Sequence, residues 1–170
     1  AENGKLSDAK TNFEKVLAKN NDNPAALNNL GVIAMAEGDL DAAWDYFERA
    51  ENAGCNSPHL GYNMGVILIK KGQYSSAVAK FSNDSFNKAL ALTLSGDNEG
   101  AVTMLNGLGS SEYGIFYYLK AVTAARADNV DDVVENLRIA ISKESKLKAY
   151  AKDDMEFLDF IDNSAFRGVI

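Results

Sequence analysis

A repeat of about 34 residues runs through the first half of the chain. Gly4, Gly38 and Gly72 are evenly spaced along it. Several other residue types keep the same interval and order: Ala9, Ala43 and Ala77; Phe13, Phe47 and Phe81; Pro24 and Pro58; Asn29 and Asn63; Gly31 and Gly65. Self-similarity at a fixed period of this length is typical of solenoids, in which each repeat is one supersecondary unit stacked on the next. The sequence therefore predicts a continuous array of helix pairs.

The repeated residues have the chemistry of helix ends and helix contacts. Pro24 follows Asn23 and Pro58 follows Ser57, which suits a helix start, since proline needs no N–H donor there and Asn or Ser caps well. Gly38 and Gly72 are expected to end a first helix in the left-handed conformation, and Asp39 to cap the second. Glycine inside a helix costs about 1 kcal/mol against alanine, so we expect close helix–helix approach at two such positions, Gly31 and Gly65.

The array becomes irregular after the second full repeat. Gly96 comes sooner after Gly72 than the repeat interval requires, so the helix ending near Phe81 and the helix starting near Ser85 must both be short. The predicted organisation over residues 1–170 is a half repeat at 1–20, repeats at 24–54 and 58–81, a shortened repeat at 85–106, a divergent repeat at 111–142 and a cap at 145–170. The cap is expected to be one helix over 146–162, with Phe166 and Ile170 packing back onto it. Because Gly4 already has the register of a mid-repeat turn, we expect the chain to be a fragment of a longer protein.

These motifs resemble the tetratricopeptide repeat (TPR) family. Its pattern is Leu-Gly on the first helix, Gly at the turn and Ala…Phe…Ala on the second, matched here by Leu30-Gly31, Gly38, Ala43, Phe47 and Ala50, and again by Met64-Gly65, Gly72, Ala77 and Phe81. Ala34 and Leu68 depart from it, since they stand where the family has a tyrosine-type residue. The resemblance implies an all-α fold, a right-handed α-α superhelix of about four helix pairs with a C-terminal capping helix.

In this family the first helix of each repeat lines a concave groove, and the resemblance implies the same here. The expected groove candidates are Asn28, Asn29, His59, Tyr62, Asn63, Val66 and Asn87. Asn29, Asn63 and Asn87 share one repeat position, and an amide both donates and accepts, so such a row can hold an extended peptide backbone. The alternative is that these amides cap or bridge neighbouring helices. Tyr113, Tyr117 and Tyr118 form a further aromatic cluster, of which at least one tyrosine is expected in the core.

Composition and residue inventory argue against several function classes. A formal net charge of −7 without a basic run disfavours nucleic-acid binding. One histidine, His59, and one cysteine, Cys55, give no catalytic device, no metal-ligand set and no cofactor site, so no enzyme activity is expected. Apolar stretches are too short for direct membrane insertion.

The sequence thus favours a scaffold that binds a protein or peptide segment in its groove. The alternative is a structural or assembly module that packs on other domains of the same protein or self-associates. C-terminal carboxylate tails of the Hsp70 and Hsp90 type are not expected to bind, because the family's cationic clamp positions hold Asn28, Val32 and Asn63. The sequence does not determine the localisation. Residues 151–157 are similar to a final helix of exported Bacteroides-type repeat proteins, and this slightly favours the periplasm over the cytoplasm.

Overall fold

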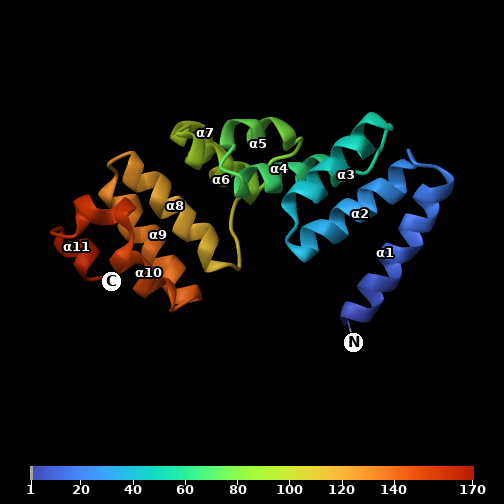
Figure 1. Ribbon diagram of the computed structural model, residues 1–170. Coiled ribbons are helices and arrows are strands. Elements are labelled where there is room, and N and C mark those ends of the chain that lie inside the picture. Colours follow the sequence, from blue (N-terminus) through green and yellow to red (C-terminus); the bar gives the residue numbers. More distant parts are fainter. Residues whose placement is uncertain (1) are drawn as a thin grey trace. The chain divides into compact units, whose positions relative to one another are not determined.

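The computed structural model describes residues 2–170, with side chains from residue 5 onward, and this part of the chain forms helices and turns without a strand (Figure 1). The helices gather into two compact units. The first unit ends at Ser82 and the second runs from Asn83 to Ile170. In the described part of the chain, none of the helices is both long and apolar enough to cross a membrane.

The first unit holds five helices: α1 (Glu2–Lys19), α2 (Pro24–Glu37), α3 (Leu40–Asn52), α4 (Leu60–Lys70) and α5 (Tyr74–Lys80). Helix α2 pairs with α3, and α4 pairs with α5, while α1 packs on α2. The ends of α2 form as the sequence indicates. The side chain of Asn23 accepts a hydrogen bond from the N–H of Ala26 at 2.9 Å, and Gly38 ends the helix at φ 86°. Asp39 then caps α3 by accepting from the N–H of Ala42 at 3.0 Å.

The second unit holds the remaining elements: α6 (Phe86–Ser95), α7 (Asn98–Gly107), α8 (Gly114–Arg126), α9 (Val130–Lys143), α10 (Leu147–Asp153), a 3₁₀ helix η1 (Met155–Phe160) and α11 (Ser164–Arg167). Here α6 pairs with α7 and α8 with α9. The turns between paired helices place a left-handed residue at equivalent positions, namely Gly38, Gly72, Gly96 and Asp128. The four-pair solenoid expected from the sequence is therefore confirmed.

The interior glycines mark the closest contacts between paired helices. A Cβ placed on Gly31 would lie 2.6 Å from the ring of Phe47, and one on Gly65 would lie 2.6 Å from the ring of Phe81. The phenylalanine follows the glycine at the same interval in both pairs. The second unit keeps this interval, but its residue pairs are Ala89 with Leu105 and Ala121 with Leu137 in place of glycine with phenylalanine. All four residues are fully buried. Where alanine replaces glycine on the first helix, leucine replaces phenylalanine on the second, so the packed volume is nearly preserved.

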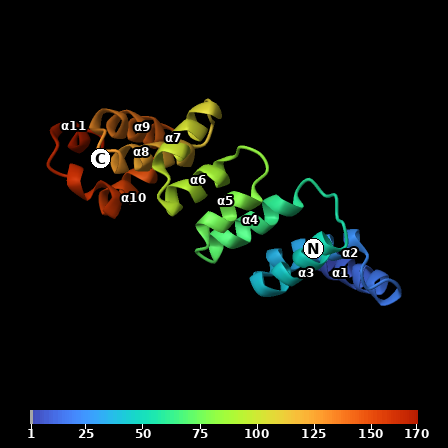
Figure 2. The same ribbon diagram turned by 90° about the horizontal axis from the view of Figure 1, so that it is seen from above.

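The C-terminal cap differs from the single helix expected over 146–162. Helix α10 ends at Asp153, Asp154 is extended, and η1 follows; Ser145 does not cap α10, whose N-cap is Lys146 without a side-chain bond. The break lets Phe157 and Phe160 turn inward against Phe166, with ring centroids 5.8 and 6.4 Å away from it. The views in Figures 1 and 2 both show this segment gathered beside α8 and α9. Burying these aromatic rings outweighs the helical hydrogen bonds lost at the break.

Two helix boundaries also differ from expectation. Gly4 lies inside α1 rather than at a turn, because one glycine costs only about 1 kcal/mol and helical residues continue on both sides of it. Pro58 lies in a turn shortly before α4, which begins at Leu60. The hydroxyl of Ser57 accepts from the N–H of His59 at 3.4 Å, so this serine stabilises that turn instead of the first turn of α4.

Candidate functional site

The first helices of the pairs expose one face in each unit, and the predicted site residues lie on these helices, except His59, which precedes α4. In the first unit, Val32 and Tyr62 are 43% and 42% exposed, although both are large and apolar. We refer to Asn28 and Val32 on α2 with Tyr62 and Val66 on α4 as the α2/α4 strip. Tyr62 and Val66 follow Asn28 and Val32 by one full repeat, so the strip repeats the same two positions.

The amides on this face are not equivalent. Asn29 is half-buried and donates from Nδ2 to the carbonyl of Ala25 on its own helix at 2.8 Å. The Oδ1 atom of Asn28 is buried and accepts no hydrogen bond from any described residue. Asn63 and Asn87 are half-buried, as is Val66, and His59 is exposed just before α4. Tyr62 packs edge-on against Phe81 at a centroid distance of 5.6 Å, which fixes its ring while one side stays exposed.

In the second unit the corresponding face is hollowed into a groove. A cavity of about 340 Å³ lies between α6, α8 and η1. Its wall is mainly apolar and includes three charged residues. The lining residues are Phe86, Leu90, Thr93, Leu94, Ile115, Tyr118, Leu119, Val122, Arg126, Asp154 and Glu156. A neighbouring cavity of about 480 Å³ shares Ile115, Tyr118 and Asp154 and adds Glu144, Lys146, Leu147 and Tyr150. We call these two cavities together the second-unit groove.

The repeat register relates this groove to the α2/α4 strip. Counted from the small residue of each pair (Gly31, Gly65, Ala89 and Ala121), Asn28 and Tyr62 correspond to Phe86 and Tyr118. In the same way Val32 and Val66 correspond to Leu90 and Val122. The position of Asn29 corresponds instead to Asn87, which does not line the cavity, and to Leu119, which is mostly buried. The groove-lining positions are thus those of Asn28 and Val32.

Hydrogen bonds hold the polar side chains of the groove in place. The hydroxyl of Tyr118 donates to Oδ2 of Asp154 at 2.7 Å, and burial together with this bond raises the pKa of Tyr118 well above its ordinary value. Arg126 donates to both carboxylate oxygens of Glu156 and to the carbonyl of Thr93, so it ties α6, α8 and η1 together. The bond to Glu156 raises the pKa of the Arg126 guanidinium, which keeps its charge.

A carboxylate also caps the start of α8. Oε1 of Glu144 accepts from the backbone N–H of Gly114 at 3.0 Å and of Ile115 at 3.4 Å, which satisfies two donors left free at a helix N-terminus. Lys146 lies 3.3 Å from the other oxygen. The Lys146 hydrogen bond first, and then these N–H groups, lower the pKa of Glu144. Gly114 is required here, because a Cβ would lie 2.7 Å from the carbonyl oxygen of Ala140.

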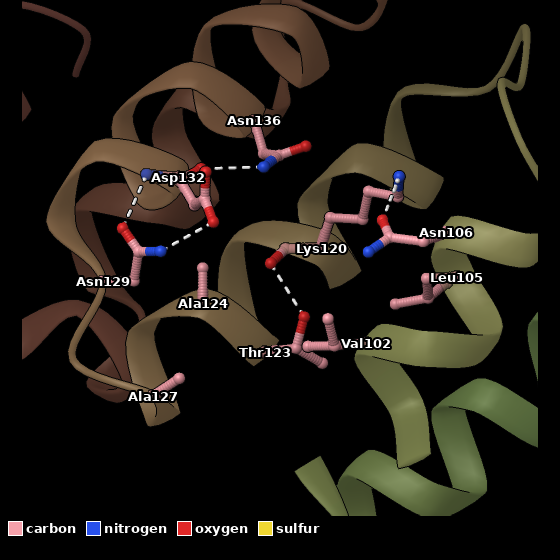
Figure 3. A pocket seen from close by; sticks show the side chains of 10 residues that line it. All are labelled: Val102, Leu105, Asn106, Lys120, Thr123, Ala124, Ala127, Asn129, Asp132 and Asn136. Carbon is pink, nitrogen blue, oxygen red and sulfur yellow. Dashed lines mark hydrogen bonds between the residues drawn. The ribbon is translucent and has the colours of Figure 1, made fainter. Parts of the chain in front are cut away.

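A third cavity, of about 320 Å³, lies between α7, α8 and α9 (Figure 3). Its polar side chains already bond to one another or to nearby backbone. Lys120 donates to Asn106 at 3.1 Å, and Asn129 donates to Asp132 at 2.7 Å. Asn136 bonds the carbonyl of Asp132, and Thr123 that of Lys120. Because these groups are satisfied within the fold, we assign this cavity a structural role.

Comparison with known proteins shows what the chain is similar to. The family model of the tetratricopeptide repeat matches residues 1–58. The structure of YrrB, a TPR protein with an unusual peptide-binding site, superposes with a TM-score of 0.78 over 90% of this chain and 86% of that chain, at 22% identity. Residues 1–58 thus match the TPR family, and the chain as a whole has the fold of a TPR solenoid. At that identity the likeness to YrrB establishes the fold and leaves its binding site a property of YrrB alone.

Curated relatives match a shorter stretch. The photosystem I assembly protein Ycf3 from two strains of Prochlorococcus marinus, MIT 9303 and MIT 9313, is 34% identical over 73 residues. The match covers 41% of this chain and 42% of each relative, so the chain spans less than half of their length. TPR proteins are generally scaffolds for protein interactions, and this chain has the corresponding fold.

Several groove residues were not expected from the sequence. The sequence indicates Asn87 on α6, but the divergent repeat at 111–142 gave no groove candidates, so Ile115, Val122 and Arg126 were not identified. The signal that finds them is the constant interval between the small residue of the first helix and the large residue of the second, which sets Ala121 against Leu137. No sequence pattern indicates Asp154, whose place in the groove depends on the break between α10 and η1.

Proposed function

We propose that this TPR chain is a non-catalytic scaffold that binds an extended segment of a partner protein on the exposed faces of its first helices. The observation that carries the proposal is the exposure of Val32 and Tyr62 on helices whose opposite faces are fully buried. Large apolar side chains that are exposed to solvent beside amides are typical of interaction surfaces, where aromatic residues supply much of the binding energy.

The α2/α4 strip offers complementary contacts to such a segment. Tyr62 packs against Phe81, so little side-chain entropy is lost when a partner covers its exposed side. Asn63 is next to Tyr62 on α4, at the repeat position of Asn29, and its half-buried amide offers a donor and an acceptor beside the strip.

Peptide selection tests this proposal. A phage-displayed library of random peptides is selected on the wild-type chain, and the affinities of the selected peptides are then measured by fluorescence anisotropy. For peptides that bind the first unit, Tyr62→Ala and Asn63→Ala should weaken binding about tenfold, because truncating an interface anchor costs more than about 1 kcal/mol. Matched controls are Tyr113→Ala and Asn52→Ala, which change exposed residues of the same types outside both faces. If the selected peptides bind Tyr62→Ala and Asn63→Ala as tightly as wild type, the assignment of the strip is refuted.

An assembly role is the second candidate, and α1 favours it. Ala9 and Phe13 are partly exposed, although the equivalent residues of the next repeat, Ala43 and Phe47, are fully buried. Leu6 and Val16 are exposed on the same helix. The curated relatives matched here are named as assembly proteins, which supports this candidate.

Light scattering across a concentration series distinguishes the two candidates. Self-association through α1 predicts dimers or larger species that Val16→Glu returns to monomers, because a charge in a buried apolar contact is strongly unfavourable. Glu14→Gln is the matched control, since Glu14 is exposed on the same helix. A monomer at every concentration would remove self-association as a function of the α1 face.

A further inference from the structure

The second-unit groove places one carboxylate between two apolar cavities. We propose that it binds a partner segment in which aliphatic side chains alternate with a lysine or arginine. The inference rests on the proposed scaffold function and adds the chemistry of the segment. It follows from the wall of the groove and from the bonding of Asp154.

The apolar part of the groove can take up aliphatic side chains. Leu90 and Leu94 on α6 face Ile115 and Val122 on α8 across the first cavity. Ile115 also lines the second cavity, together with Leu147 and Tyr150. Leu94, Ile115 and Tyr150 are exposed, so a bound aliphatic group would remove apolar surface from water on both sides. The volumes of about 340 and 480 Å³ lie within the range of ligand cavities.

Asp154 gives the groove its charge preference. Its carboxylate accepts from the hydroxyl of Tyr118 and from the backbone N–H of Glu156 at 3.0 Å, both neutral donors. The two cations of the groove wall are engaged with other carboxylates, Arg126 with Glu156 and Lys146 with Glu144. Among the described ion pairs Asp154 takes part in none. A carboxylate has four acceptor positions, so Asp154 can still receive charged donors from a ligand.

The charge balance of the groove excludes an acidic segment. Three acids and two bases line it, and the whole chain carries a formal net charge of −7. An anionic side chain next to Asp154 would meet like charge at short range, whereas an ammonium or guanidinium group would form a charge-assisted hydrogen bond. The groove therefore favours a base at its centre.

The position of Asp154 sets the spacing of the segment. Because Asp154 lines both cavities, the base must lie between the two aliphatic groups. In an extended chain, side chains two residues apart point to the same face at about 6.6–6.8 Å separation. A segment with leucine, lysine and leucine at alternate positions presents all three to the groove.

Peptide binding tests the preference directly. The probe is the fluorescein-labelled peptide Gly-Ser-Leu-Ser-Lys-Ser-Leu-Gly, with one matched peptide in which glutamate replaces the lysine and another in which serine replaces both leucines. Fluorescence anisotropy with the full chain should show the probe binding at least about tenfold tighter than either. Equal affinity for the lysine and glutamate peptides, or no binding of the probe, would overturn the proposal.

Variants locate the binding. Asp154→Asn should reduce the preference for lysine over glutamate about tenfold, and Leu94→Ser should weaken binding of the probe while keeping that preference. Asp159→Asn and Leu158→Ser are the matched controls, because both residues are exposed on η1 but do not line the groove. Circular dichroism checks that each variant is folded. Should Asp154→Asn fail to fold, the wild-type preference must still decline as NaCl rises from about 0.05 M to about 0.5 M, since salt screens an exposed ion pair; a preference unaffected by salt contradicts the proposal.

These outcomes are distinguishable from those of the proposed function. If Asp154→Asn leaves binding unchanged while Tyr62→Ala and Asn63→Ala weaken their selected peptides, only the chemistry assigned to the second-unit groove is wrong. If neither set of variants alters any peptide, the scaffold proposal fails with it.

Discussion

Replacing Gly31 by alanine tests how closely the paired helices approach. A Cβ at this position would lie 2.6 and 2.7 Å from two ring carbons of Phe47, whereas carbon atoms in contact normally stay about 3.5–4.0 Å apart. About 1 Å must therefore be absorbed by a ring that is fully buried between helices. Overpacking of this kind costs about 1–3 kcal/mol, and alanine returns about 1 kcal/mol in helix propensity. We expect Gly31→Ala to lower the free energy of unfolding by about 0–2 kcal/mol, the difference between these two effects.

A double-mutant cycle separates the clash from other effects. Phe47→Leu alone should destabilise the chain by about 1–2 kcal/mol through lost burial and a small cavity. Combined with Gly31→Ala it recreates the pairing seen in Ala89 with Leu105, so the double variant should be more stable than the sum of the single effects by about 1–2 kcal/mol. Urea unfolding followed through the single tryptophan, Trp44, reports on this repeat, because Trp44 packs against the same core cluster.

The control is Gly107→Ala at the end of α7. No atom lies within 4 Å of a Cβ placed there, so this change should leave stability unchanged or raise it by about 0.4–1 kcal/mol. If Gly31→Ala were also stabilising, or if the cycle were additive, the close approach to Phe47 would not be the reason for glycine at this position.

Three further predictions concern the second unit and the partner class. Gly114→Ala should destabilise the chain by about 2 kcal/mol in urea unfolding, because the backbone oxygen of Ala140 cannot move away as a side chain can; a stability equal to wild type would contradict this. Lys146 and the N–H groups of α8 lower the pKa of Glu144 in the folded chain. Glu144 therefore stabilises the fold at pH values above its unfolded pKa of about 4.3, and this stabilisation is lost as pH falls through its folded pKa. Wild type and Glu144→Gln should therefore differ in urea midpoint at pH 7 and converge near about pH 3, and a constant difference would exclude this role. Isothermal titration with a peptide ending in Glu-Glu-Val-Asp should give no binding, since no Lys or Arg pair occupies the clamp positions on α2 and α4; micromolar affinity would contradict it.

The sequence predicts those features that depend on local chemistry repeated at a fixed spacing. Asn23, Gly38 and Asp39 act at helix ends through their own side chains or backbone, so neighbouring residues suffice to identify them. Gly31 and Gly65 are recognisable because glycine inside a helix is unfavourable unless a neighbour needs the space. The short helices around Phe81 and Ser85 follow from the missing residues alone.

The cap and the groove could not be predicted, because both depend on residues distant in sequence. The helical pattern continues through Asp154, and the bond that holds this residue extended comes from Tyr118, 36 residues earlier. Helix α8 is apolar around most of its circumference, so periodicity alone does not show that Ile115 and Val122 face the groove while Leu119 is mostly buried. Packing of α8 against α6 and η1 determines which of its side chains face the groove.

The same repeat position carries different chemistry along the chain, and this is where the two units diverge. The residue three places before the small packing residue is Asn28, then Tyr62, Phe86 and Tyr118, while the packing residues change only between glycine and alanine. The residue five places after it is Ala36, then Lys70, Leu94 and Arg126. A residue of the wrong size at a packing position lowers the free energy of unfolding by about 1–3 kcal/mol, so these positions change little. The outward positions can change with little effect on stability. The first unit therefore presents amides and single apolar residues, and the second presents apolar walls around a carboxylate. A partner that recognises both must contain two chemically distinct segments, so peptides selected on the α2/α4 strip should not compete with the leucine–lysine probe for the second-unit groove.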